Sequence, residues 1–266
     1  MSDTVQARHN GSTDRFGYEW HSYHAVLAAY EEQFNRWLPM FSRSDWAGKR
    51  FLDVGCGMGR NSFWPMTYGA QSGVAVDLDP RSLAAARRNL ANHTRLQVIE
   101  ASAYELPFEN EFDIAFSIGV IHHLEFPSRA LTAMTRATKP GGRVAIWVYG
   151  RENNGWFIHV LNPMRRALFA RLPIGLTHHL SVYPTALLWL ALRLGIQPLT
   201  YFKLIATFNF HHLRSIVFDQ MLPHIANYWR QDEVEALMHA AGMTEIRLDW
   251  VNEMSWAAVG TKPQSG

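Results

Sequence analysis

The chain has 266 residues, 48% of them hydrophobic, and a formal net charge of +2 with histidine neutral. This suffices for one large domain with a full core, or for a domain that carries a subdomain. The weak charge balance does not favour nucleic-acid binding by the whole molecule, and a single cysteine, Cys56, excludes an intramolecular disulfide. With no signal peptide and no apolar run long enough to span a bilayer, we expect a cytoplasmic protein.

The N-terminal part predicts a polar lead-in followed by one amphipathic helix. Residues 1–15 are polar, which is typical of a poorly ordered terminus. An aromatic cluster follows at residues 16–20. Apolar side chains then recur at helical spacing over residues 25–41, and Pro39 lies near the expected end of that helix.

From residue 50 onward, short apolar strands alternate with predicted helices. Strands that are apolar throughout are buried on both faces, so the pattern predicts a parallel sheet covered by helices on both sides. The expected helices begin near residue 59, at Pro80 and at residue 127. The expected strands lie at 50–54, 73–77, 96–100, 112–118 and 143–149.

The two ends of this alternation carry turn signals. Residues 139–142 (Lys-Pro-Gly-Gly) are predicted to stop a helix and to turn the chain into the fifth strand. A helix is expected over residues 232–241. Two strands then follow at 244–251 and 255–261 with no helix between them, which predicts an antiparallel hairpin at the sheet edge.

Residues 151–228, here called the insertion, do not continue the alternation. They carry seven Lys or Arg residues against Glu152 and Asp219, a formal charge of +5, so the rest of the chain carries −3. They also hold six of the thirteen histidines. We expect a mostly helical unit at the mouth of the sheet.

A glycine-rich turn follows the first strand and is the strongest chemical signal. Gly55, Gly57 and Gly59 alternate with other residues after Asp53, where glycine lets the backbone turn tightly and lets a ligand approach it. A dinucleotide site would have G-x-G-x-x-G spacing instead. An acid here is a poor neighbour for a diphosphate, but it can orient a cationic amino acid moiety.

A second acid closes the next strand. Asp77 is placed to accept hydrogen bonds from both ribose hydroxyls of a nucleoside. Leu78 is expected against the adenine face, whereas Asp79 precedes Pro80 and is expected to cap a helix.

These motifs, with residues 101–108, 112–124 and 139–143, resemble the class I S-adenosylmethionine-dependent methyltransferases, especially the small-molecule group. The resemblance covers residues 50–150 and, less closely, 231–262. It implies an α/β fold with a Rossmann-like, seven-stranded, mostly parallel sheet whose last strand is antiparallel.

The resemblance also implies a division of the chain and a cofactor, S-adenosylmethionine. Residues 1–48 would cover the cofactor site, residues 49–150 with 229–262 would bind the cofactor, and the insertion would cover the acceptor. In many relatives an aspartate contacts the adenine amino group, and Ser102 replaces it here. The expected cofactor-binding residues are Tyr18, Asp53, Gly55, Cys56, Gly57, Gly59, Asp77, Leu78, Ser102, Ala103, Ser117 and Ile118.

Methyl transfer to a hydroxyl requires removal of its proton, and histidine is the usual base near neutral pH. The resemblance places His122 and His123 after the fourth strand, facing the methyl group; the alternative is that one or both cap the next helix or pack structurally. We expect one of them to act as the general base. The expected acceptor-binding residues are Trp20, His122, Tyr149, Trp156, Arg165 and Arg166. No metal site is expected, because adjacent histidines on a helix point in different directions.

The sequence therefore predicts a methyltransferase acting on a small molecule, with an oxygen acceptor favoured over nitrogen or carbon. The acceptor would be apolar or anionic, because the insertion combines aromatic and basic residues, and its apolar run 186–196 would suit contact with a membrane surface. A nucleotide-dependent oxidoreductase, a non-catalytic binding module and a nucleic-acid methyltransferase are the alternatives. The acceptor's identity and the oligomeric state are not predicted.

Overall fold

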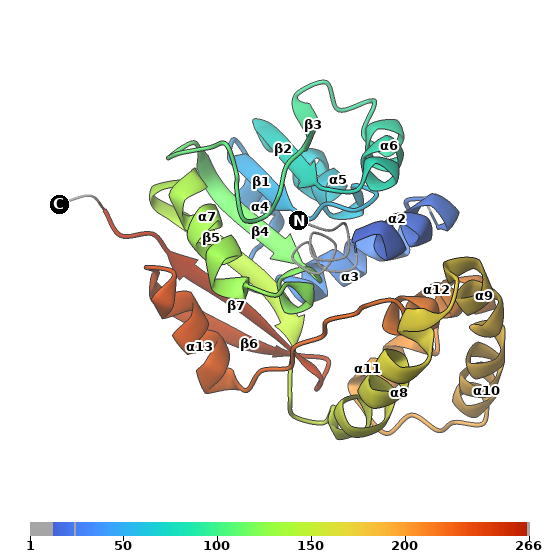
Figure 1. Ribbon diagram of the computed structural model, residues 1–266. Helices are drawn as coiled ribbons and strands as arrows, with labels where there is room; N and C mark the ends of the chain where they lie inside the picture. The colour runs from blue at the N-terminus through green and yellow to red at the C-terminus, as the bar shows by residue number, and fades with distance from the viewer. Residues whose placement is uncertain (1–12, 24, 265–266) are drawn as a thin grey trace.

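The computed structural model describes residues 13–23 and 25–264. Its centre is a seven-stranded sheet in the order β3-β2-β1-β4-β5-β7-β6. All pairings among the first five strands are parallel, whereas β7 runs antiparallel to both β5 and β6. The predicted α/β fold and the terminal hairpin are confirmed (Figure 1). The strands are β1 Arg50–Val54, β2 Ser72–Asp77, β3 Leu96–Glu100, β4 Phe112–Ile118, β5 Thr138–Tyr149, β6 Thr244–Val251 and β7 Ser255–Thr261.

Helices cover both faces of the sheet, and each face forms its own hydrophobic core with the helices that cover it. Alternate residues of a strand point to opposite faces, so Leu52 and Val54 join the core under one set of helices while Phe51 joins the other. The first core lies under α7 (Pro127–Ala137) and α13 (Gln231–Ala240). The second face is covered by α3 (Ala29–Trp37), α4 (Arg43–Trp46), α5 (Arg60–Thr67) and α6 (Pro80–Asn89).

The N-terminal prediction was wrong in two respects. A helix, α2, already spans Thr13–Ser22, and the next helix covers only Ala29–Trp37 rather than residues 25–41. Gly17 lies in the middle of α2, where glycine ordinarily weakens a helix. A Cβ there would meet Asp79 Oδ1 at 1.9 Å, so glycine permits close contact between α2 and α6. The part of the lead-in at residues 1–12 lies outside the described residues.

The start of the fifth strand also differs from the prediction. β5 begins at Thr138, so residues 139–142 lie within the strand and not in a turn before it. The register shifts there: Phe112 pairs with Thr138, whereas Ile114 pairs with Arg143. The Pro-Gly-Gly sequence therefore makes a bulge, which lets the chain enter the sheet directly from α7.

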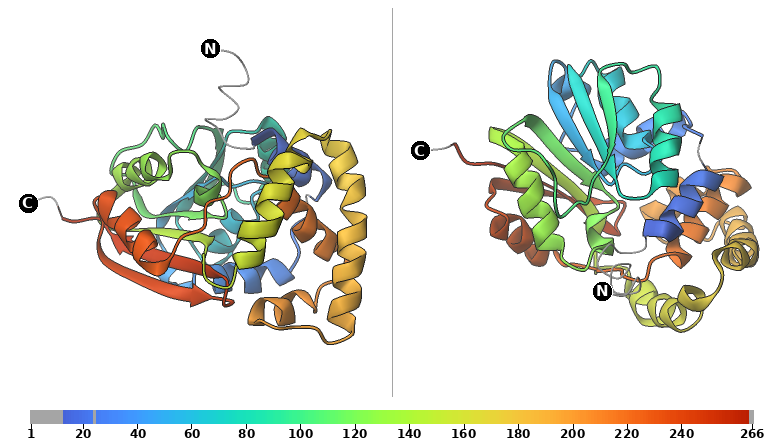
Figure 2. Two further views of the ribbon diagram at one scale, coloured as in Figure 1. Left: turned by 60° about the horizontal axis from the view of Figure 1, so that its bottom comes forward. Right: turned by 45° about the horizontal axis from the view of Figure 1, so that its top comes forward.

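The insertion is helical, as expected, and lies beside α2 beyond the carboxyl ends of the parallel strands (Figures 1 and 2). Arg15 in α2 links it to the N-terminal helix, because its guanidinium donates to the carbonyls of Leu222 and Phe169, both at 3.0 Å. In the described part of the chain, no helix has the length and apolar character to cross a membrane. The helices of the insertion are η2 Phe157–Leu161, α8 Asn162–Ala167, η3 Phe169–Arg171, α9 Ile174–Leu180, α10 Val182–Arg193, α11 Thr200–Ile205 and α12 Phe210–Met221.

Candidate active site

The glycine loop after β1 is held against the end of β2. The backbone N–H groups of Gly55 and Cys56 donate to the Val76 carbonyl at 2.8 and 2.9 Å. Gly55 and Gly57 have φ values of 78° and 54°, in the region that favours glycine. A Cβ on Gly57 would also lie 2.8 Å from Nε1 of Trp20. Glycine at this position therefore lets the indole of Trp20 pack directly against the loop backbone.

Asp77 joins that loop to the second strand. One carboxylate oxygen accepts from the N–H of Gly57 at 2.8 Å, and the other accepts from Leu78 and Asp79 at 2.8 and 3.0 Å. Burial raises the pKa of Asp77, and the three backbone donors oppose that rise. Asp79 caps α6 as predicted, accepting from the N–H groups of Arg81 and Ser82.

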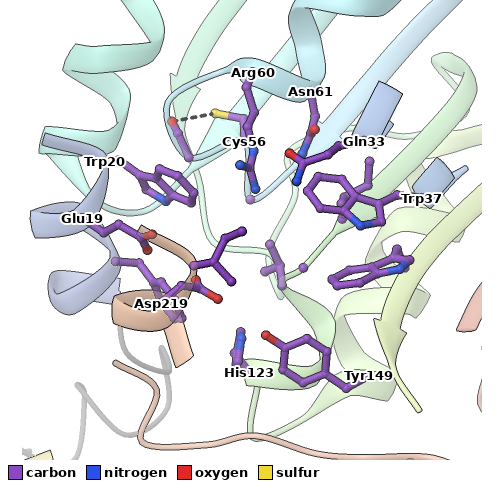
Figure 3. A pocket seen from close by; sticks show the side chains of 18 of the residues that line it. Glu19, Trp20, Gln33, Trp37, Cys56, Arg60, Asn61, His123, Tyr149 and Asp219 are labelled. Carbon is purple, nitrogen blue, oxygen red and sulfur yellow. Dashed lines mark hydrogen bonds between the residues drawn. The ribbon is translucent and has the colours of Figure 1, made fainter. Parts of the chain in front are cut away.

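A cavity lies at this edge of the sheet, between the strand ends, α2 and the insertion (Figure 3). Its walls come from four parts of the chain: the N-terminal helices, the glycine loop, the ends of β2, β4 and β5, and helices α11 and α12. Eleven of the predicted site residues line it: Trp20, Gly55, Cys56, Gly57, Asp77, Leu78, Ser102, Ala103, Ile118, His123 and Tyr149.

Four residues that were predicted to bind the cofactor do not line the cavity: Asp53, Gly59, Ser117 and Tyr18. Asp53 is 1% exposed and accepts from Ser62 Oγ at 2.6 Å, because it points to the face of β1 that α5 covers. Burial raises the pKa of Asp53 to about 7.

The other three have separate structural roles. Ser117 donates to the Val54 carbonyl at 2.8 Å and so ties β4 to β1. Gly59 has a φ of 84° at the start of α5, and the ring of Tyr18 packs against His178 instead of the cavity.

Two expected acceptor contacts also lie off the cavity wall. Trp156 is 59% exposed on the outside of the insertion, although its neighbour Phe157 does line the cavity. Arg165 is buried and donates to the carbonyl of Gln220 at 3.1 Å and to the side chain of Asn162. Its charge therefore stabilises the insertion. The side chain of Arg166 lies outside the described residues.

The two histidines after β4 have different surroundings. His122 is completely buried against the ring of Tyr149 and does not line the cavity, and neither ring nitrogen has a hydrogen-bond partner among the described residues. His123 lines the cavity, and its Nδ1 lies 2.8 Å from the Ile225 carbonyl oxygen. The structure thus places His123 at the cavity wall and His122 behind it, because only His123 of the 3₁₀ turn at residues 121–123 faces the cavity.

His123 has a defined tautomer. A carbonyl oxygen can only accept a hydrogen bond, so Nδ1 must carry the proton and Nε2 keeps its lone pair. Burial lowers the pKa of His123 to about 3, so the ring stays neutral near pH 7. The arrangement makes His123 a hydrogen-bond acceptor toward a ligand group that carries a proton.

Sequence reasoning missed two carboxyl groups in the cavity wall. Glu19 of α2 and Asp219 of α12 point toward one another in Figure 3. Burial and mutual repulsion raise the pKa of Glu19, and burial raises that of Asp219 to about 6. The two carboxyl groups therefore hold protons more tightly than ordinary carboxyl groups do. The residues are 200 positions apart, so no local pattern connects them.

Arg60 is the cation of this wall, and it too was missed. It follows the last loop glycine directly, and its guanidinium lies about 5 Å from the ring centres of Trp20, Tyr30 and Trp37. Such contacts hold the charge by cation–π attraction. A local signal existed, because an arginine at the first turn of the helix that follows a ligand-binding loop is close to any ligand there.

Residues 52–146, from β1 to β5, match the family described as a methyltransferase domain. The chain contains a class I methyltransferase domain. Over 118 residues the chain is 36% identical to the tRNA U34 carboxymethyltransferase of Klebsiella pneumoniae, covering 41% of this chain and 35% of that protein. Over 132 residues it is 32% identical to the ubiquinone biosynthesis O-methyltransferase of Dechloromonas aromatica, covering 45% and 55%.

The matched region thus spans about one third of the length of the first relative and slightly more than half of the second. The fold of the methyltransferase domain is shared with human N-acetylserotonin methyltransferase, whose structure was solved with S-adenosylmethionine. That comparison has a TM-score of 0.58 and 14% identity, and it covers 99% of this chain and 60% of the human one.

S-adenosylmethionine is the methyl donor of class I methyltransferase domains, and the cavity fits it. A nucleoside needs an acceptor for its ribose hydroxyls, and Asp77 brings a carboxylate to the cavity beside the glycine loop. The methionine end carries both an ammonium and a carboxylate group. The same cavity wall carries complementary side chains: Arg60 for the carboxylate, and Glu19 with Asp219 for the ammonium group.

Proposed function

We propose that this protein transfers the methyl group of S-adenosylmethionine to a hydroxyl oxygen of a small, largely apolar molecule. The observation that carries this proposal is the position of His123, whose unprotonated Nε2 belongs to a ring in the cavity wall. An acceptor hydroxyl that donates to Nε2 is oriented through its oxygen lone pair for in-line attack.

When bound, S-adenosylmethionine supplies an electrophilic methyl group on its sulfonium. Asp77 would hold the ribose, the backbone at Gly55 and Gly57 would contact the methionine part, and Ser102 with Ala103 would contact the adenine. These assignments rest on where the side chains lie around the cavity. The division into residues 1–48, 49–150 with 229–262, and the insertion is part of the same proposal.

The walls around His123 favour a small apolar acceptor. Tyr149 and Tyr228 stack with ring centres 5.4 Å apart, and Phe16 lies 5.0 Å from the ring of His123. An aromatic ring would bury its faces against such walls. Helices α2 and α12 close the cavity from the side opposite the sheet. This enclosure favours a small acceptor that fits entirely inside the cavity rather than a segment of a polymer.

The test has two stages. Calorimetry with S-adenosylhomocysteine first measures cofactor binding, and a panel of catechols and hydroquinones is then incubated with S-adenosylmethionine. Mass spectrometry should show addition of one methyl group, and fragmentation should place it on oxygen. Methylation of RNA but of no hydroxylated aromatic would contradict the acceptor class, and folded protein without cofactor binding would contradict the whole proposal.

A further inference from the structure

Helix α10 exposes an apolar stripe on the insertion. Tyr183, Leu187, Leu190 and Leu194 are 70%, 72%, 52% and 71% exposed. They follow one another at intervals of four, three and four residues, so they lie along one face of the helix. α10 lies at the edge of the molecule farthest from the sheet (Figures 1 and 2), where no other part of the described chain covers this stripe.

A second apolar row runs along η2 and α8. Trp156, Val160, Met164 and Leu168 recur at every fourth position and are 59%, 47%, 41% and 47% exposed. The row begins next to Phe157, which lines the cavity. Single exposed leucines are ordinary, but continuous apolar rows on a protein surface mark an interaction site.

The exposed charged side chains of the insertion are mainly positive. Among the insertion's charged side chains whose exposure the structure describes, the exposed cations include Arg171, Arg193 and Lys203, and the exposed acid is Glu152. Arg193 ends α10 within the stripe, and its guanidinium lies 5.1 Å from the ring of Trp189. Apolar and aromatic side chains bordered by cations match the interface of an anionic bilayer.

We propose that the stripe on α10 and the row on η2–α8 dock the protein on the surface of an anionic lipid bilayer. The apolar side chains enter the boundary between headgroups and acyl chains, and Arg171, Arg193 and Lys203 contact the lipid phosphates. A second copy of this chain fits less well, because a two-fold contact would bring the same cations against one another.

Docking on a membrane would also define the class of acceptor, and this part rests on the proposed function. The row that begins at Trp156 would place the cavity wall at Phe157 beside the bilayer. The acceptor would then be a hydroxylated aromatic molecule with an apolar tail that resides in the membrane.

The test is sedimentation of the full chain with vesicles, without methyl donor or acceptor. The vesicles contain phosphatidylcholine alone or with about one third phosphatidylglycerol, which sets the surface charge. The double variant Leu187→Glu/Leu194→Glu changes two side chains that are more than 70% exposed, so the fold should survive. Phe126→Glu, 39% exposed and outside the insertion, is the matched control.

Wild-type protein and the Phe126 variant should bind the anionic vesicles, and added salt should weaken that binding. The double variant should bind at least about tenfold more weakly, because charges replace the buried apolar groups. Circular dichroism and binding of S-adenosylhomocysteine should be the same in all three proteins. This second measurement separates a failure of docking from a failure of the proposed function.

Three results would overturn the docking proposal. The first is a wild type that sediments with neither vesicle, and the second is a double variant that binds as tightly as the wild type. The third is a wild-type dimer in sedimentation velocity that the double variant abolishes, which would identify the surface as an interface between two copies.

Discussion

Nδ1 of His123 lies 2.8 Å from the carbonyl oxygen of Ile225, which joins the turn after β4 to the end of the insertion. The N–H of Asn227 donates to the carbonyl of His122 at 2.8 Å and strengthens the same connection. The ring of His123 is therefore held in one orientation by a segment that is about a hundred residues away in the chain.

Replacement of His123 by alanine should lower kcat about a hundredfold or more, the usual contribution of a positioned base. The affinity for S-adenosylhomocysteine should stay unchanged, because the ring belongs to the acceptor part of the cavity. Turnover of an acceptor found in the panel, together with calorimetry, checks both statements. A His123→Ala variant with wild-type kcat would exclude this residue as the base.

His122→Ala is the informative partner of that variant. It should cost about 2 to 3 kcal/mol of unfolding free energy, because it removes a buried ring and leaves a cavity. Since His122 does not line the site, kcat per folded molecule should change far less than in His123→Ala. Urea unfolding and turnover of the soluble fraction measure the two effects separately.

Asp77→Ala should abolish detectable binding of S-adenosylhomocysteine. The change removes the acceptor for the ribose and also the anchor for the N–H of Gly57. Asp79→Ala is the matched control, since it removes a helix cap two residues away and should cost about 1 kcal/mol of stability while binding persists. Equal affinity in the two variants would refute the role given to Asp77.

Gly57→Ala should weaken cofactor binding and also destabilise the protein. Its φ is 54°, and the new Cβ would lie 2.8 Å from the indole nitrogen of Trp20. Gly48→Ala provides a control, because its φ is 71° but no atom lies within 4 Å of the added Cβ. Both variants should lose about 1 kcal/mol or more from backbone strain, and Gly57→Ala alone should lose affinity. Thermal unfolding with and without S-adenosylhomocysteine would show the difference.

Asp53 predicts a dependence of stability on pH. Its pKa in the folded protein is about 7, against an ordinary value of 3.8. The folded state therefore binds the proton more tightly, so this stabilisation is complete below about pH 4 and is lost as the pH rises through 7. The full difference corresponds to about 4 kcal/mol.

Asp53→Asn should remove this component while Ser62 still donates to the side-chain oxygen. Urea unfolding at pH 5 and pH 8, without ligand, should show a larger decrease in the wild type than in the variant. Other titrating groups, including Glu19 and Asp219, are present in both proteins and cancel in the comparison. Parallel decreases would mean that Asp53 is not the group responsible.

The sheet could be predicted because each strand carries its own signal: a short apolar run between turn residues. The helix α2 could not, because Gly17 reads as a helix breaker until its contact with Asp79 is known. The positions of Gly55, Gly57 and Asp77 at the cavity could be predicted because they depend on neighbouring residues in the sequence. The pairing of Glu19 with Asp219, and the choice between His122 and His123, depend on the packing of α2 and the insertion, which no local pattern specifies.

The hydrogen bonds of Arg15 bear on how this protein can be recombined with its relatives. Its guanidinium links α2 to carbonyls in two separate parts of the insertion, those of Phe169 and Leu222. A chimera that exchanges only residues 151–228 would leave this arginine facing foreign backbone. Acceptor preference should therefore transfer between homologues only when the first 23 residues and the insertion are exchanged together.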